Sequence, residues 1–167
     1  MKEYPMLIEY PLDISAALSY ARRWAYGRNP AYYDFDPIGG DCTNFISQCI
    51  FAAGAVMNFT PDIGWYYISL NDRAAAWTGV DFFARFILTN TGAGPFGRLV
   101  SRQELRAGDV VQLGNSQRFY HTLLVTGTQS GEVLVAAHSR DVYGAKLSAF
   151  SFTQLRCIRI GGARKYT

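Results

Sequence analysis

The chain has 167 residues, of which 49% are hydrophobic, and this length fits one domain, residues 1–167, with a core of ordinary size. Its 16 Lys and Arg against 13 Asp and Glu make it mildly basic without a clustered basic run, so we expect no nucleic-acid partner. No apolar run approaches the ~20 residues that a membrane-spanning helix needs.

Three cysteines are too few, and odd in number, for a disulfide framework. Cys42 and Cys49 cannot bridge within one helix, because seven residues at a rise of ~1.5 Å separate them by about 10 Å. Free thiols favour a reducing compartment, and residues 1–11 lack the hydrophobic core and cleavage site of a secretion signal. We therefore expect a cytoplasmic location, or an extracellular one if a leader has been removed or export is unconventional.

Two amphipathic helices are expected in the first third of the chain. Residues 14–25 repeat apolar side chains at helical spacing, and Asp13 precedes them as a capping residue. A loop over residues 29–40 follows. Residues 42–53 repeat the helical pattern, with Asp41 at the N-cap position and Gly54 as the stop.

The middle of the chain is expected to alternate turns with short helices. Residues 55–77 hold several aromatic side chains among turn formers, which indicates an ordered excursion. Thr78 and Asp81 stand at capping-box spacing before a third helix over residues 80–88. Ser101 and Glu104 repeat that spacing before a short turn.

From residue 109 onward the pattern changes to short β-rich segments, at residues 110–113, 121–126, 132–138 and 157–160. Helices followed by an antiparallel sheet are typical of an α+β domain. We find no internal repeat.

Cys42 is the candidate nucleophile. It would lie in the first turn of its helix, where free backbone amides and the helix dipole favour the thiolate. The same amides can donate to an oxyanion. The alternative is that Cys42 is a small buried residue on the apolar stripe that includes Phe45 and Cys49.

The chain has two histidines, His121 and His138, and both fall in predicted strands around a turn. If the turn centres on Gln129 and Ser130, facing residue numbers sum to 259, so His121 would lie opposite His138 on one sheet face. A slip of one residue would place them on opposite faces. Packing of the Cys42 helix on that face would assemble nucleophile, base and orienting group. The alternative for each histidine is a structural role.

The segment Gly40-Asp41-Cys42-Thr43-Asn44-Phe45-Ile46-Ser47-Gln48, preceded by Tyr32-Tyr33-Asp34-Phe35, resembles the signature of a family of predicted bacterial amidases in the papain-like cysteine peptidase superfamily. Three later segments agree with it: Gly108-Asp109-Val110-Val111, Tyr120-His121-Thr122 and Ala137-His138-Ser139. The resemblance covers residues 14–159. Relatives of this family include the CHAP and NlpC-like peptidases, which cleave amide bonds in peptidoglycan stem peptides.

The resemblance implies a papain-like α+β fold, with N-terminal helices packed on a C-terminal antiparallel sheet. It implies a cysteine amidase or peptidase that acts through a thioester, with Cys42 as nucleophile, His121 as base and His138 as orienting group. The expected partner is a peptide or amide substrate, including a cell-wall peptide, and no metal or organic cofactor is required. We take four residues as candidates for substrate binding, although burial in the core is the alternative for the aromatic ones: Tyr32, Tyr33, Asp41 and Trp65.

Three other interpretations stay open. Cys42, His121 and His138 could instead hold zinc, although ligand spacing such as Cys-x-x-Cys is absent. The chain could be a non-catalytic binding module with the same fold, or a transferase with the same site. Loop residues Asn115, Ser116 and Asp141 are rival orienting groups, although such residues usually satisfy turns.

Overall fold

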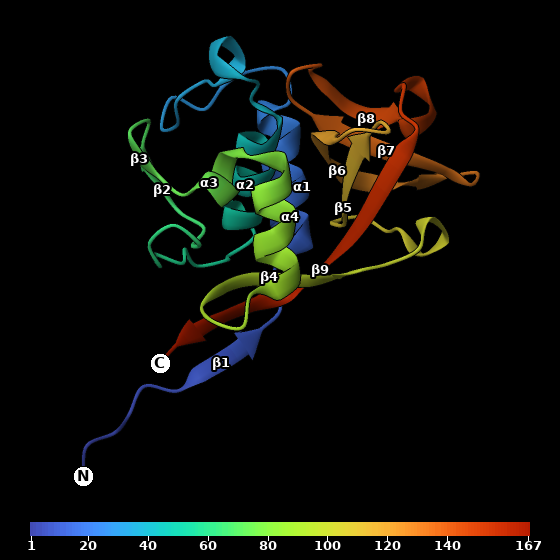
Figure 1. Ribbon diagram of the computed structural model, residues 1–167. Coiled ribbons are helices and arrows are strands. Elements are labelled where there is room, and N and C mark those ends of the chain that lie inside the picture. The colour runs from blue at the N-terminus through green and yellow to red at the C-terminus, as the bar shows by residue number, and fades with distance from the viewer.

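The computed structural model describes residues 1–167 as an α+β arrangement of helices and a large antiparallel sheet (Figure 1). The α-helices are α1 (Ile14–Trp24), α2 (Cys42–Ala52), α3 (Ala75–Thr78) and α4 (Val80–Thr89). Three short 3₁₀ helices occur as well, η1 (Asp36–Ile38), η2 (Arg102–Glu104) and η3 (Leu147–Ala149). The expected α+β class is confirmed.

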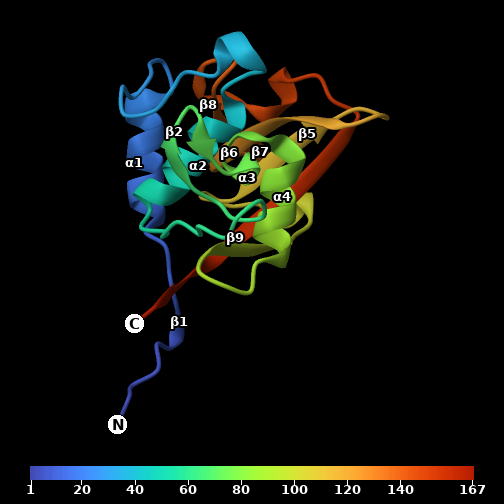
Figure 2. The same ribbon diagram turned by 60° about the vertical axis from the view of Figure 1, so that its left-hand side comes forward.

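Helix α2 is the central helix of the structure. It packs against α1 and α3 and against strands of the sheet, and Figure 2 shows it behind α3 and between α1 and α4. All of its residues from Cys42 to Ile50 are buried. A helix that is covered on every side needs polar partners for its polar side chains, and these partners define the site described below.

Two of the four expected side-chain caps form. Asp41 is the N-cap residue of α2, as expected, but its side chain makes no capping hydrogen bond to the helix backbone. The Asp13 carboxylate accepts a hydrogen bond from Ala16 N at 3.1 Å at the start of α1. Ser101 and Glu104 form the capping box of η2. The box expected from Thr78 and Asp81 does not form, because Gly79 occupies the N-cap position of α4 and the Thr78 hydroxyl accepts from Arg73 instead.

The main sheet has seven strands, in the order β1-β9-β5-β6-β7-β8, with β4 also paired to β9. The strands are β1 (Leu7–Tyr10), β4 (Gly94–Leu99), β5 (Val110–Gly114), β6 (Phe119–Gln129), β7 (Glu132–Ala137), β8 (Val142–Lys146) and β9 (Gln154–Tyr166). A small second sheet pairs β2 (Tyr67–Ser69) with β3 (Asp72–Arg73). The sequence predicts β5, β6, β7 and part of β9, but not the strands β1, β2, β3, β4 and β8. Because β1 precedes α1, the helices do not all come before the sheet.

The register expected for the β6–β7 hairpin is wrong. The turn residues are Ser130 and Gly131, with φ of 52° and 79°, which are the left-handed conformations of a tight hairpin turn. Gln129 faces Glu132, and a β-bulge shifts the register between Val125 and Gly127. Beyond the bulge Leu124 faces Ala136, so residue numbers sum to 260 instead of 259.

The two faces of β6 bury different cores. Leu124 lies in the core shared with the helices, whereas Leu123 and Val125 lie in a second core on the other face of the sheet. Because strand side chains alternate, Thr122 points toward the helices and His121 points toward the second core. The one-residue change in register therefore separates the two histidines.

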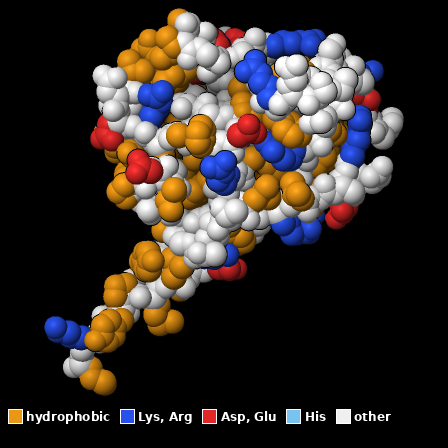
Figure 3. Space-filling view, viewed as in Figure 1, with side chains coloured by type: hydrophobic (Ala, Val, Ile, Leu, Met, Phe, Trp, Pro, Cys, Tyr) orange, Lys and Arg blue, Asp and Glu red, His pale blue; other side chains and the backbone are white.

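None of the helices combines the length and the apolar character that a membrane-spanning helix requires. The first six residues are exposed and project from the body of the molecule (Figures 1 and 3). On the face shown in Figure 3, hydrophobic and charged side chains are intermixed.

Candidate active site

Cys42 is the first residue of α2, as expected. The first backbone hydrogen bond of the helix runs from Phe45 N to Asp41 O at 3.0 Å, so the amides of Cys42, Thr43 and Asn44 have no partner inside the helix. The Cys42 side chain is 7% exposed. Its sulfur accepts from the backbone N–H of Thr43 and of Thr122, and it lies 3.8 Å from Thr43 Oγ1. The nucleophile candidate therefore lies beside the peptide that joins His121 to Thr122.

The expectation that the helix end lowers the pKa of Cys42 is wrong. Burial raises the pKa of this thiol above its ordinary value, and the nearby Asp41 carboxylate adds to the rise. The hydrogen bonds from Thr122 and Thr43 oppose the rise without cancelling it. Cys42 is therefore a thiol at neutral pH, and its reaction as a nucleophile requires a base.

The Asp41 carboxylate is turned away from the sulfur and is almost fully buried. Its Oδ1 accepts from Phe35 N at 2.9 Å and from Asn44 Nδ2 at 2.8 Å. Its Oδ2 lies 2.6 Å from His138 Nδ1 and 3.7 Å from Arg28 Nε. With 1% exposure it cannot contact a substrate in this structure, so Asp41 holds the start of α2 and does not line a substrate groove.

His138 uses both ring nitrogens within the fold. Nδ1 bonds Asp41, and Nε2 lies 2.7 Å from Trp24 O at the end of α1. The ring stacks on Phe45 with centroids 3.8 Å apart. Because a carbonyl oxygen only accepts, Nε2 carries a proton, and the short contact to Asp41 requires a second proton shared by that pair. His138 therefore joins the end of α1 to the N-cap of α2 and has no nitrogen left to orient His121.

His121 has the opposite environment. Neither ring nitrogen has a hydrogen-bond partner within the protein, and the ring lies near Phe150, with centroids 5.9 Å apart. Burial, together with the positive charge of Arg140, lowers the pKa of His121 to about 4. At neutral pH the imidazole is uncharged and can accept a proton, as a general base must.

The three aromatic candidates for substrate binding differ in how far their side chains are exposed to solvent. Trp65 is fully buried and donates from Nε1 to Ser47 Oγ at 3.0 Å, so it belongs to the core and not to a groove. Tyr32 is half-buried and stacks on Trp77. Tyr33 is 38% exposed, and its carbonyl oxygen accepts from Asn44 Nδ2 in the first turn of α2. Tyr33 is therefore the one of these candidates that is both open to solvent and close to Cys42.

The rival orienting groups do not contact His121. Asn115 Oδ1 accepts from Gln117 N and Arg118 N, and so it closes a turn. Asp141 accepts two hydrogen bonds from Arg28, each at 3.1 Å. Ser116 is an exposed turn residue.

Cys42, His121 and His138 are not placed to bind one zinc ion together. Both nitrogens of His138 are occupied, and His121 points to the other face of the sheet. No group of three or more His, Cys, Asp or Glu side chains is placed to hold a metal ion.

Sequence reasoning missed Arg28, which binds several acidic side chains around the start of α2. Its guanidinium bonds Asp34 at 3.4 Å, Asp36 at 2.5 Å and Asp141 at 3.1 Å. The loop before α2 is thereby tied to the turn after β7. An arginine followed by a run of aspartates was the available signal, but the sequence alone does not show which carboxylates meet it.

The environment of His121 can be tested by NMR titration of the two imidazoles. We expect the His121 ring to titrate near pH 4, because burial and Arg140 disfavour the charged form. Arg140→Gln should raise that value, whereas Arg102→Gln, a surface change, should leave it unaltered. A His121 ring that titrates near its unperturbed value of ~6.5 would contradict the buried environment described here.

The structural role of His138 can be tested by comparing His138→Asn with His121→Asn. Loss of the buried His138 leaves Asp41 without its closest partner and should cost about 3 kcal/mol of unfolding free energy. His121→Asn removes no hydrogen bond and should cost about 1 kcal/mol. Urea unfolding of both variants measures the difference. Equal losses would show that His138 does not hold the helices as described.

The sequence was compared with protein families, with curated proteins and with solved structures. Residues 12–160 match the model of a family described as "Putative amidase domain". The chain is also 35% identical over 137 residues to "Uncharacterized protein YhbB" of Bacillus subtilis (strain 168), in an alignment that covers 79% of this chain and 43% of YhbB. The chain thus spans less than half the length of that relative, and no solved structure matches it significantly. On the family match over most of its length, the chain belongs to the putative amidase domain family.

Proposed function

We propose that this protein is a cysteine-dependent amide hydrolase with a papain-like arrangement, in which Cys42 is the nucleophile and His121 the base. One observation carries the proposal: the Cys42 sulfur, at the start of α2, accepts a hydrogen bond from the N–H of Thr122, the residue that follows a histidine with free ring nitrogens. Membership of an amidase family supports amide hydrolysis as the reaction.

The raised pKa of Cys42 and the lowered pKa of His121 indicate which group holds the proton before the reaction. Burial keeps both the Cys42 thiol and the His121 imidazole uncharged at neutral pH. A preformed thiolate–imidazolium pair is therefore not the resting state. The thiol proton passes to His121 as the sulfur attacks, which is general-base catalysis of the kind that serine hydrolases use.

The reaction then has two stages. Sulfur bonds to the carbonyl carbon, and the proton held by His121 goes to the leaving amine as the C–N bond breaks, which leaves a thioester. Water next attacks the thioester with His121 as base, and the sulfur leaves with its proton restored. The free Cys42 N–H at the start of α2 is the donor we assign to the oxyanion.

His121 must turn toward the sulfur in this mechanism. Its ring now lies near Phe150 on the far face of the sheet, but its backbone is adjacent to the N–H that bonds the sulfur. Because the Cβ of a strand residue points to one face of the sheet, this movement needs a local change of the backbone near the start of β6 as well as rotation of the side chain. Neither ring nitrogen has to break a hydrogen bond. Catalytic hydrogen bonds often tighten only when substrate binds.

We propose a peptide substrate, and peptidoglycan stem peptides are the first to test because of the resemblance to CHAP and NlpC-like peptidases. Exposed groups on both sides of the site could contact such a chain, Tyr33 near the start of α2 and Arg140 near His121. A positively charged Arg140 favours a substrate with a carboxylate close to the cleaved bond.

The test is turnover of stem peptides and simple peptide amides, followed by mass spectrometry. Cys42→Ala should reduce turnover by about 10³-fold or more, and His121→Ala should be nearly as inactive, because nucleophile and base act as one unit. The double variant should be no worse than either single variant. Incorporation of ¹⁸O from labelled water into the new carboxylate separates a hydrolase from a transferase.

Cys49→Ala is the matched control for these variants. Cys49 lies on the same helix, is fully buried, and has a pKa raised by that burial, so it is not a nucleophile. Its loss should cost about 1 kcal/mol of stability and leave turnover per folded molecule unchanged. If Cys42→Ala keeps wild-type turnover, the hydrolase mechanism is wrong. If wild-type protein also fails to react with a peptide electrophile at Cys42, a binding module becomes the better interpretation.

A further inference from the structure

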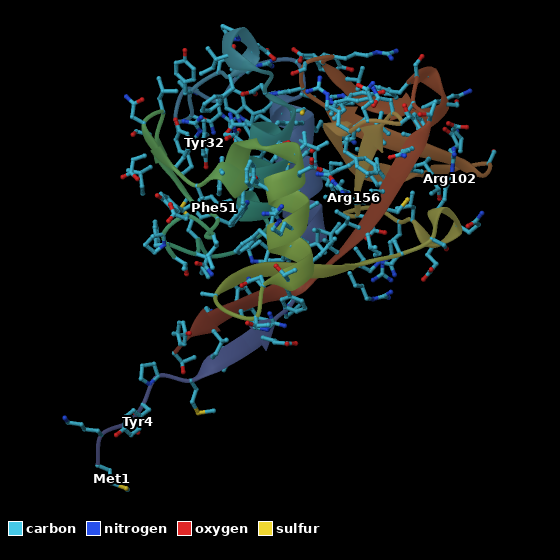
Figure 4. The ribbon with its side chains drawn as sticks, viewed as in Figure 1. Met1, Tyr4, Tyr32, Phe51, Arg102 and Arg156 are labelled. Atoms are coloured by element: carbon cyan, nitrogen blue, oxygen red, sulfur yellow. The ribbon has the colours of Figure 1, made fainter.

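A chain of side-chain hydrogen bonds links the Cys42 sulfur to an arginine on the far strand β9. Arg156 Nε bonds Gln112 Oε1 at 2.8 Å, and Gln112 Nε2 bonds Thr122 Oγ1 at 3.2 Å. Thr122 Oγ1 lies 2.9 Å from Thr43 Oγ1, which lies 3.8 Å from the sulfur. Arg156 is labelled beside α4 in Figure 4, and its ion-pair partner Asp81 lies on that helix.

The three linking side chains are completely buried. Gln112, Thr122 and Thr43 each have 0% exposure and lie where α2 packs on the sheet. Apolar side chains of similar size would fill this interface without the cost of removing polar groups from water. A fully satisfied polar chain inside a core therefore calls for a reason other than packing.

The chemistry of the donors gives the chain one direction when the sulfur is negatively charged. A guanidinium and an amide NH₂ can only donate, so Arg156 donates to Gln112 and Gln112 donates to Thr122. Each of the two hydroxyls can donate or accept while Cys42 is a thiol. A thiolate only accepts, so once the sulfur is charged Thr43 Oγ1 donates to it and accepts from Thr122 Oγ1. In that state every bond in the chain points from the positive charge of Arg156 toward the sulfur.

We propose that Arg156, Gln112, Thr122 and Thr43 form a donor relay that stabilises negative charge on the Cys42 sulfur as it attacks. Thr43 and the Thr122 backbone touch the reacting sulfur. Arg156, Gln112 and the Thr122 hydroxyl act through other groups, so they are positioning groups. The proposal rests on the proposed function, because it assumes that Cys42 is the nucleophile. Hydrogen bonds in a low-dielectric interior polarise one another, so the charge of Arg156 can act over several bonds.

The other charged groups around the sulfur show why a relay is useful. Asp41 is the nearest fixed negative charge, and it opposes a thiolate. Its partner His138 compensates part of this charge at the start of α2. His121 is uncharged at neutral pH. Arg156, whose own ion pair is with the exposed Asp81 at 3.0 Å, is the cation that the hydrogen bonds connect to the sulfur.

The experiment measures the rate of Cys42 alkylation by iodoacetamide against pH, with peptide mass spectrometry to assign the site. Thr43→Val removes the last donor while it keeps the shape of the side chain. We expect it to raise the apparent pKa of Cys42 by about one unit, and so to slow alkylation about tenfold at any pH below that pKa. Thr43→Ser should restore the wild-type profile, because it restores the hydroxyl.

Two further variants keep the test independent of folding. Arg156→Gln changes a partly exposed residue at the far end of the relay, and it should shift the apparent pKa in the same direction by a smaller amount. Ser47→Ala is the control, because this hydroxyl is equally buried on α2 but donates to Trp77 O, away from the sulfur. Its alkylation profile should equal that of wild type.

Unchanged profiles in both Thr43→Val and Arg156→Gln would overturn the relay. That outcome leaves the hydrolase proposal intact, since loss of turnover in Cys42→Ala does not depend on the relay. Conversely, turnover that survives Cys42→Ala would remove the nucleophile, whatever the alkylation profiles show.

Discussion

The buried pair of Asp41 and His138 is the interaction on which the candidate site depends. It connects three elements that are distant in sequence: the end of α1 through Trp24 O, the N-cap of α2, and the turn after β7. A carboxylate and an imidazole that are each 1% exposed can be stable only with complete hydrogen bonding, and both side chains have it. The pair therefore fixes where α2 begins, and with it the position of Cys42.

The two histidines show how environment assigns different tasks to one residue type. His138 has both nitrogens bonded and its ring stacked on Phe45, so it can only hold structure. His121 has free nitrogens, a pKa lowered by burial, and a backbone next to the sulfur's hydrogen-bond donor. In the proposed mechanism the free imidazole moves the proton, while the bonded one keeps the helix in place.

Much of the framework could be predicted from the sequence, because the signals were local. The helical spacing that follows Asp13 and Asp41 places α1 and α2 correctly, and the Ser101 to Glu104 spacing gives a real capping box. The register of the β6–β7 hairpin could not be predicted, because it depends on a bulge and on which two residues form the turn. Because the observed register differs by one residue from the expected one, His138 does not face His121. It bonds Asp41 instead. The hydrogen-bond chain to Arg156 joins residues from four elements, and no local pattern marks it.

In the proposed mechanism His121 is the general base for Cys42. A crystal structure of the protein with a peptide-like electrophile bound covalently to Cys42 tests this role most directly. We expect the His121 ring to leave Phe150 and to bring a nitrogen within about 4 Å of the Cys42 sulfur, while His138 keeps both of its hydrogen bonds. A His121 ring that stays beside Phe150, with the adduct turned away from it, would contradict this role.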